Sequence, residues 1–156
     1  ELKKGHYKND NLTINIVIPE LNAVALEGSG EIRINDFKST ENVAITLSGS
    51  GNIFVDENEG CKNLVVTIDG SGNVYAQENF INLLFLNVKI SGSGSYDGFA
   101  NSAVTSNLAI EGSGFCNVFA VETLNANING SGSVNYKGNP AVTSKIKGSG
   151  KVNNKN

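Results

Sequence analysis

The tripeptide Gly-Ser-Gly occurs seven times, and this spaced repeat constrains the fold more than any other feature of the 156-residue chain. The copies lie 21, 21, 22, 20, 18 and 18 residues apart and begin at Gly28, Gly49, Gly70, Gly92, Gly112, Gly130 and Gly148. Repeats of this length are typical of proteins built from stacked supersecondary units, each too small to bury an apolar face alone. The sequence therefore indicates a repeat array.

Apolar and polar residues alternate on both sides of each tripeptide. Two positions before the first glycine, every copy has Leu or Ile: Leu26, Leu47, Ile68, Ile90, Ile110, Ile128 and Ile146. Four positions after it stand Ile32, Ile53, Val74, Tyr96, Cys116, Val134 and Val152. The residue directly before the glycine is polar in all seven copies. Alternation with a period of two predicts strands with one buried face.

Two short strands in each repeat predict an all-β fold, a right-handed parallel β-helix (β-solenoid) of about seven coils marked by Gly-Ser-Gly. Stacking gives each apolar residue an equivalent above and below it, and right-handed winding follows the usual crossover preference. We expect a single domain over residues 1–156. Residues 1–20 lead into the repeat, residues 21–152 form the coils, and residues 153–156 form a tail. Residues 78–86 are expected to be strand or loop.

Gly-Ser-Gly is expected to form the corner of each coil, because glycine tolerates positive φ and close approach of neighbouring chains. A phosphate-binding loop would need Lys-Ser or Lys-Thr after the glycines and a following helix, and the sequence has neither. The serines are expected to stack as a ladder of hydroxyl groups. The abundant asparagines are expected to form similar ladders along the array.

Charge and hydropathy exclude several classes of partner. The formal net charge is −3 and the pI is about 5.1, which argues against a nucleic-acid-binding protein. No apolar run approaches the roughly 20 residues of a membrane-spanning helix. The chain opens at Glu1 without a methionine, which fits a mature form whose signal peptide has been removed.

These residues resemble the bacterial envelope family described as the autotransporter adhesin head domain, or "head GIN" domain. The resemblance lies in residues 18–21 and 24–32, which look like that family's first strand, and in residues 130–140, which look like its closing repeat. It covers residues 12 to 156. It implies a right-handed β-helix in the periplasm, at the outer membrane or at the cell surface of a bacterium. No enzymatic activity comes with it, and members usually have a longer N-terminal half.

No residue pattern predicts a catalytic, cofactor-binding or metal site. The single histidine, His6, lies in a polar stretch and is expected at the surface. Cys61 and Cys116 fall about two and a half coils apart, beyond the roughly 7 Å that a disulfide allows, so we expect two free thiols. Three carboxylates precede the glycines of alternate coils and are expected to form a solvated face: Glu27, Asp69 and Glu111.

Phe54 and Tyr75 are the candidate contact residues for a ligand or partner. Both stand five positions after the first glycine of adjacent copies, on the side that alternation predicts to face outward. Neighbouring outward aromatic rings can stack on sugar rings or pack against a protein. They can equally lie beneath a loop, so a structural role is the alternative.

The sequence favours a non-catalytic β-helix module of a bacterial cell-envelope or surface protein that serves adhesion or surface interaction. The partner would be an unknown protein or carbohydrate. The first alternative is a β-helix protein that binds or degrades polysaccharide, and the second is a structural subunit that polymerises end to end.

All charged residues after Glu122 are lysines. Lysines at an open β-edge oppose edge-to-edge pairing, so we expect a monomer.

Overall fold

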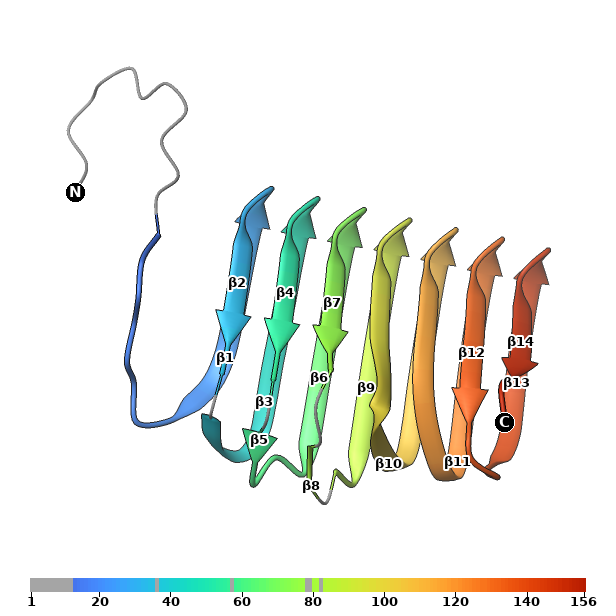
Figure 1. Ribbon diagram of the computed structural model, residues 1–156. Helices are drawn as coiled ribbons and strands as arrows, with labels where there is room; N and C mark the ends of the chain where they lie inside the picture. Colours follow the sequence, from blue (N-terminus) through green and yellow to red (C-terminus); the bar gives the residue numbers. More distant parts are fainter. Residues whose placement is uncertain (1–12, 36, 57, 78–79, 82) are drawn as a thin grey trace.

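The computed structural model shows an all-β, parallel β-solenoid of about six turns (Figure 1). It describes residues 13–35, 37–56, 58–77, 80–81 and 83–156. Within these residues there are fourteen strands and no helix, and every strand pairing is parallel. In the same part of the chain, no helix has the length and apolarity that a membrane crossing needs.

The strands follow one another with few intervening residues. They are β1 (Leu21–Gly28), β2 (Glu31–Ile34), β3 (Phe37–Gly49), β4 (Asn52–Val55), β5 (Asn58–Glu59), β6 (Asn63–Gly70), β7 (Asn73–Ala76), β8 (Phe80–Ile81), β9 (Phe85–Gly92), β10 (Ser95–Gly112), β11 (Phe115–Gly130), β12 (Ser133–Lys137), β13 (Ala141–Gly148) and β14 (Lys151–Asn154). Residues 80–81 are strand and residues 83–84 are loop, so the described part of residues 78–86 is strand or loop, as the sequence predicts.

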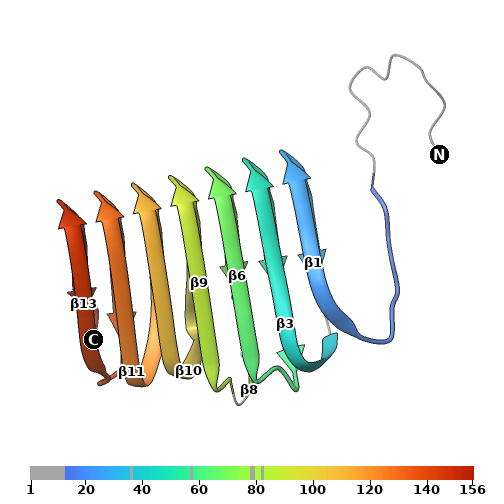
Figure 2. The same cartoon turned by 180° about the vertical axis from the view of Figure 1, so that it is seen from behind.

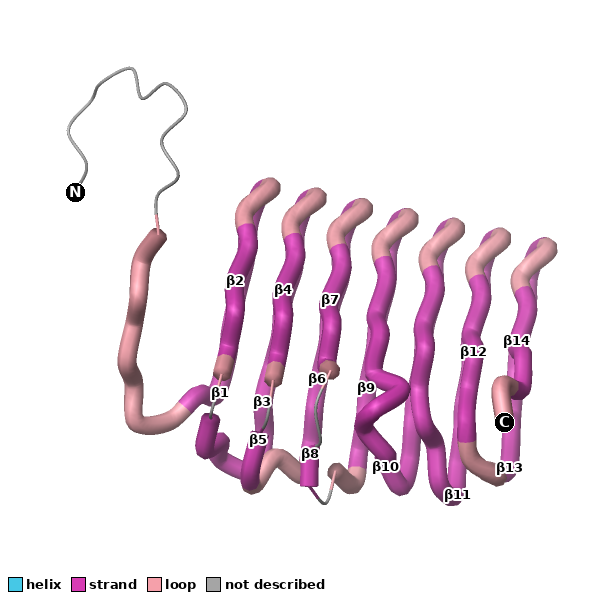
Figure 3. Tube along the Cα trace, viewed as in Figure 1, coloured by secondary structure: helices cyan, strands magenta, loops and turns pink. Residues whose placement is uncertain are grey.

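Each turn of the solenoid has a front strand and a rear strand. The front sheet contains β2, β4, β7, the first part of β10, the first part of β11, β12 and β14 (Figure 1). The rear sheet contains β1, β3, β6, β9, the later parts of β10 and β11, and β13 (Figure 2). The tube view shows the same pairs of strands joined by bends at the top of every turn (Figure 3).

The terminal coils are incomplete, which accounts for the count of about six turns. β1 is a rear strand before the first bend, and β14 is a front strand after the last one, so each contributes only half a turn.

At the bends the first glycines are in register from coil to coil: Gly28 with Gly49, Gly49 with Gly70, Gly70 with Gly92, Gly92 with Gly112, Gly112 with Gly130, and Gly130 with Gly148. The winding sense and the count of seven coils stay predictions.

Stacked aliphatic side chains form the core between the two sheets. In the column two positions before the first glycine, the interior members are at most 2% exposed: Leu47, Ile68, Ile90, Ile110 and Ile128. The terminal members differ, since Leu26 is half-buried and Ile146 is 40% exposed. In this column, full burial is found only where a coil lies on both sides of the residue.

Close stacking of the bends explains the third glycine of the tripeptide. A Cβ atom built on Gly72 would lie 2.6 Å from both the carbonyl oxygen of Gly51 and the Cδ2 of Leu47, which is closer than real Cβ contacts. The first glycine has a different reason, because Gly70 adopts a φ of 122° that favours glycine. The bend therefore needs glycine at both positions.

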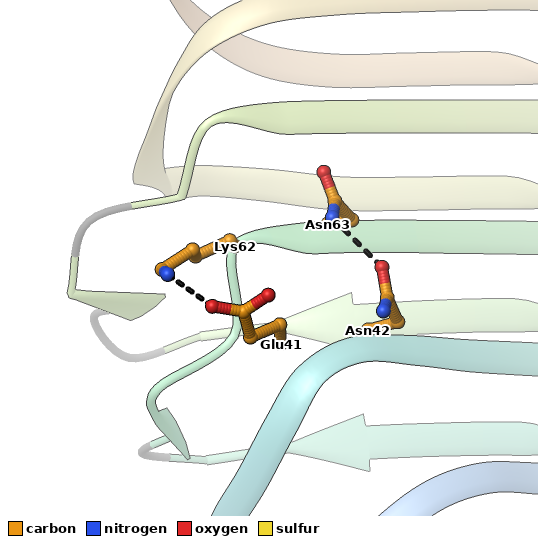
Figure 4. A network of polar contacts seen from close by, with 4 residues as sticks. All are labelled: Glu41, Asn42, Lys62 and Asn63. Carbon is orange, nitrogen blue, oxygen red and sulfur yellow. Dashed lines mark hydrogen bonds and ion pairs between the residues drawn. The ribbon is translucent and has the colours of Figure 1, made fainter.

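Polar contacts join neighbouring coils at the opposite, lower edge. The Lys62 ammonium binds the Glu41 carboxylate, and the Asn63 amide donates to Asn42 Oδ1 at 2.7 Å (Figure 4). The hydrogen bond and the charge of Lys62 hold the pKa of Glu41 below its usual range. These pairs align the start of the rear strand in one coil with its equivalent in the next.

Candidate functional site

A single column of outward side chains runs the length of the front sheet. Strand register places its members one coil apart, in the order Arg33, Phe54, Tyr75, Asp97, Asn117, Asn135 and Asn153. All of them except exposed Arg33 are half-buried. The column therefore passes from a cation through two aromatic rings and a carboxylate to three amides.

The structure brings the predicted contact residues Phe54 and Tyr75 together. Their ring centroids lie 4.9 Å apart with the planes inclined by 13°, and the Arg33 guanidinium carbon lies 4.3 Å from the Phe54 centroid. Both faces of the Phe54 ring are thus covered by neighbours in its own column. A sugar ring would have to approach the ring edges, because stacking needs an open face. A role for the pair in binding stays a prediction.

A shallow open groove lies on the outer surface of the rear sheet. It comprises two adjoining hollows of about 340 Å³ each, which share Ala109 and Asn127. We call it the rear groove. Its outward lining side chains include Thr67, Asn87, Lys89, Asn107, Ala109, Asn125, Asn127, Glu111, Lys145 and Lys147. The groove runs along the solenoid axis, across β6, β9, β10, β11 and β13.

Three stacked amides form one border of the rear groove. Asn107 donates to Asn87 Oδ1 at 3.0 Å, and Asn125 donates to Asn107 Oδ1 at 2.9 Å. A primary amide has two N–H donors and an oxygen with two lone pairs. Because the ladder uses one donor and one lone pair of Asn107, one of each is left to face a ligand.

The opposite border combines small and basic residues. Lys89, Ala109, Asn127 and Lys145 occupy one column in successive coils. Ala109 leaves a depression between longer neighbours, and Lys89 and Lys145 are exposed on either side of it. Lys147 and Glu111 stand in the next outward column. The groove therefore offers amide, ammonium and carboxylate groups beside the outward apolar side chains of Val65 and Ala109.

The candidate carboxylates form the exposed column that the sequence predicts. Glu27, Asp69 and Glu111 are all exposed, and strand register places Ser48 and Ser91 between them. Each acid is therefore two coils from the next, or about 9–10 Å along the axis. A glycoside hydrolase usually places its two catalytic acids on either side of the bond that it cleaves. These three acids are instead spread along a line.

The cysteine thiols lie in the core. Cys61 and Cys116 are both free and fully buried, and Cys116 pairs in register with Tyr96. Burial raises the pKa of the Cys61 thiol to about 11, and it raises the pKa values of Cys116 and Tyr96 further above their usual range. These groups remain protonated at neutral pH and make poor nucleophiles.

Metal ligation finds no support in the described residues, where no group of three or more His, Cys, Asp or Glu side chains gathers. His6 lies outside the described residues, so its expected surface position is not addressed.

Sequence reasoning missed the rear groove. Its signal was present three and five positions before the first glycine, where asparagine recurs in Asn87, Asn107, Asn125 and Asn127. Asparagine ladders were expected, and the structure contains them on both sheets. The expected serine ladder is much weaker. Among the described bend serines, the shortest hydroxyl contact is 3.5 Å, between Ser131 and Ser149.

These features define a parallel β-solenoid with a packed aliphatic core and an axial groove on its outer surface. The family model described as "putative auto-transporter adhesin, head GIN domain" matches residues 1–140, and the chain belongs to this family. The family that the sequence resembles is thus confirmed.

A solved structure shares the fold. It is the crystal structure of a "putative lipid binding protein" from Parabacteroides distasonis ATCC 8503, with a TM-score of 0.68 and 25% sequence identity. The match covers 89% of this chain and 62% of that protein, so this chain spans less than two thirds of its neighbour's length. No curated protein matches the chain.

Proposed function

We propose that the chain is a non-catalytic module of a bacterial cell-envelope or surface protein, and that it binds extended carbohydrate along the rear groove. In this proposal the solenoid is right-handed and its seven coils are marked by Gly-Ser-Gly. Equivalent side chains recur along its axis, where they contact successive units of a polymer. The observation that carries the proposal is the asparagine ladder bordering the groove.

The ladder suits sugar hydroxyl groups, because a hydroxyl both donates and accepts. Asn107 retains one amide N–H and one oxygen lone pair. Parallel stacking repeats these groups about every 4.7–4.9 Å along the axis. An extended glycan lying along the axis would meet the same pair of hydrogen-bonding groups in successive coils.

The lysines favour a glycan that carries carboxylates. Lys89, Lys145 and Lys147 outnumber Glu111 among the charged residues of the groove. Their flexible stems allow each ammonium to reach an acidic group on the ligand. We therefore expect stronger binding to uronic-acid polysaccharides than to neutral ones, and weaker binding at high salt.

Family membership supports the location in this proposal. An adhesin-like family suggests a protein of the bacterial surface or envelope, with the periplasm, the outer membrane and the cell surface as the candidate compartments. The spread of Glu27, Asp69 and Glu111 along a line supports binding without hydrolysis.

A polysaccharide array with product analysis tests the proposal. We expect the purified chain to retain neutral and uronate-containing polymers, with slower elution for the acidic ones. Prolonged incubation should leave polymer length unchanged in size-exclusion chromatography. Shortened polymer would identify the degrading alternative instead. A failure to bind any extended polysaccharide would exclude carbohydrate polymers as the ligand.

Lipid is a second candidate ligand, favoured by the solved neighbour described as a "putative lipid binding protein". Between the described strands, the core column is filled by side chains such as Leu47, Ile68 and Ile90. A lipid would therefore have to contact an outer face. Co-sedimentation with vesicles of neutral and of anionic phospholipid separates this candidate from the first, because polysaccharide binding predicts no retention on either vesicle.

A further inference from the structure

The first front strand, β2, has an unoccupied edge. β2 pairs with β4 on one side, and no described strand pairs with its other side. The apolar side chains show the consequence, since Ile34 is 8% exposed and Ile32 is half-buried, whereas Ile53 and Val55 in the next coil are at most 2% exposed. A free strand edge of this kind accepts an extended segment through backbone hydrogen bonds.

A suitable segment lies just before β1. Residues 13–16 read Thr-Ile-Asn-Ile, which repeats the polar-apolar alternation of Glu-Ile-Arg-Ile in β2. The two isoleucines, Ile14 and Ile16, are 70% and 75% exposed. Figure 1 shows this segment extending beside the first coil without joining the sheet.

Existing strand register specifies how the segment would fit. Leu21, at the start of β1, pairs with Ser39 in β3, and the register shifts between this pair and the next one, Ala23 with Ala44. The segment before β1 would continue the register of the Leu21 pair. Counting back equally along both chains brings Ile16 opposite Ile34, Asn15 opposite Arg33, and Ile14 opposite Ile32. The two isoleucines then enter the core side and the polar residues face outward, as in every coil that follows.

We propose that residues 13–16 dock on the free edge of β2 as a parallel strand and complete the first coil. Residues 17–20 then form the lower turn, just as residues 138–140 connect β12 to β13. Docking covers Ile32 and Ile34 and pairs the backbone groups of β2. It also closes an edge that could otherwise pair with another chain.

A designed disulfide tests this register in the full chain. Parallel neighbours lie about 4.7–4.9 Å apart, within the roughly 4.4–6.8 Å between Cα atoms that a disulfide needs. Asn15→Cys with Arg33→Cys should therefore form an intramolecular bond under mild oxidation. Non-reducing electrophoresis and intact mass would report a monomer lighter by two hydrogens, while the native thiols Cys61 and Cys116 stay buried.

The matched control pairs Asn15→Cys with Phe54→Cys, because Phe54 lies one coil beyond Arg33. This pair should remain reduced. Disulfide-linked dimers of the Asn15–Arg33 variant would assign the β2 edge to a second copy and overturn the proposal. A folded variant that stays fully reduced would overturn it as well.

Hydrogen exchange on the unaltered chain keeps the proposal testable if the cysteine variant does not fold. With the strand docked, the amides of β2 should exchange as slowly as those of β4. Replacing Ile14 and Ile16 with Ser should then speed exchange in β2 and lower the thermal midpoint, while Thr13→Ser should do neither. Rapid exchange of the β2 amides in the unaltered chain would contradict docking.

Discussion

The rings of Phe54 and Tyr75 stack across two neighbouring coils, with centroids 4.9 Å apart. This distance is close to the spacing of paired strands, about 4.7–4.9 Å, so the register of β4 and β7 accounts for the stack. The same rule produces the amide ladders on both sheets. In this solenoid, the residue types in one column determine which contacts form along it.

Core stacking predicts a large difference between two adjacent residues. Ile68 is fully buried between Leu47 and Ile90, whereas Asp69 is exposed. Ile68→Ala should lower the free energy of unfolding by about 2–5 kcal/mol through lost burial and a cavity. Asp69→Ala should change it by less than about 0.5 kcal/mol. Urea unfolding measures both, and equal effects would contradict the assigned strand faces.

Bend stacking predicts different outcomes for two glycines in equivalent positions. Gly72→Ala would place a Cβ 2.6 Å from the Gly51 carbonyl oxygen, so we expect destabilisation of about 1–3 kcal/mol. At Gly30, a Cβ would meet only Leu26 Cδ1 at 3.6 Å. Gly30→Ala should be neutral or slightly stabilising, because alanine restricts the unfolded chain. Thermal melts of the two variants provide the comparison, and matching midpoints would argue against close packing of the bends.

Buried thiols predict a loss of stability at alkaline pH. Burial raises the pKa of Cys61 to about 11 and raises that of Cys116 as well, so both stay protonated in the folded state while the unfolded chain ionises near pH 9. The stabilisation is complete below the unfolded pKa and is lost as pH rises toward the folded one. The slope approaches about 1.4 kcal/mol per pH unit for each thiol.

Urea unfolding at a series of pH values from about 7 to 11 measures this slope. Cys116→Ala, compared with its own neutral-pH stability, should show a shallower decline than the unaltered chain. An unchanged slope would mean that the Cys116 thiol ionises equally in both states.

The C-terminal edge predicts a role for its lysines in keeping the chain monomeric. Lys145, Lys147 and Lys151 are exposed on β13 and β14, the last strands of the solenoid. Like charges oppose the approach of a second open edge. Substituting all three with Ser should increase self-association in analytical ultracentrifugation. If the triple variant remains monomeric at high concentration, the lysines do not have this protective role.

Much of the fold follows from the sequence because each coil repeats the same alternation. Leu47, Ile68 and Ile90 align in sequence and in space, since each lies two positions before a first glycine and those glycines pair in register from coil to coil. The terminal coils depart from the pattern for a physical reason. Ile146 occupies the same column but is 40% exposed, because no described strand covers β13 on its outer side.

The candidate site was harder to predict. Alternation places Phe54 and Tyr75 outward, but it does not give the ring orientation that leaves Phe54 covered by Arg33 and Tyr75. The rear groove depends on small Ala109 lying between longer neighbours in two directions. The neighbours of Ala109 along its strand can be read from the sequence. Its neighbours on the adjacent strands are known only once the coils are stacked.

Two asparagines test the account most directly, because each is the middle member of a three-amide ladder on a different sheet. Asn107 bonds Asn87 and Asn125 beside the rear groove, at 3.0 and 2.9 Å. Asn135 makes the equivalent bonds on the front sheet, to Asn117 at 2.9 Å and to Asn153 at 3.0 Å. Substituting either with Ala removes two ladder hydrogen bonds, so the losses of stability should be similar.

The decisive measurement is the affinity of both variants for a uronic-acid polysaccharide, by isothermal titration calorimetry. Asn107→Ala should weaken binding several-fold, corresponding to roughly 0.5–1.5 kcal/mol for each lost hydrogen bond to the ligand. Asn135→Ala should bind like the unaltered chain. Equal affinities for the two variants would contradict binding along the rear groove.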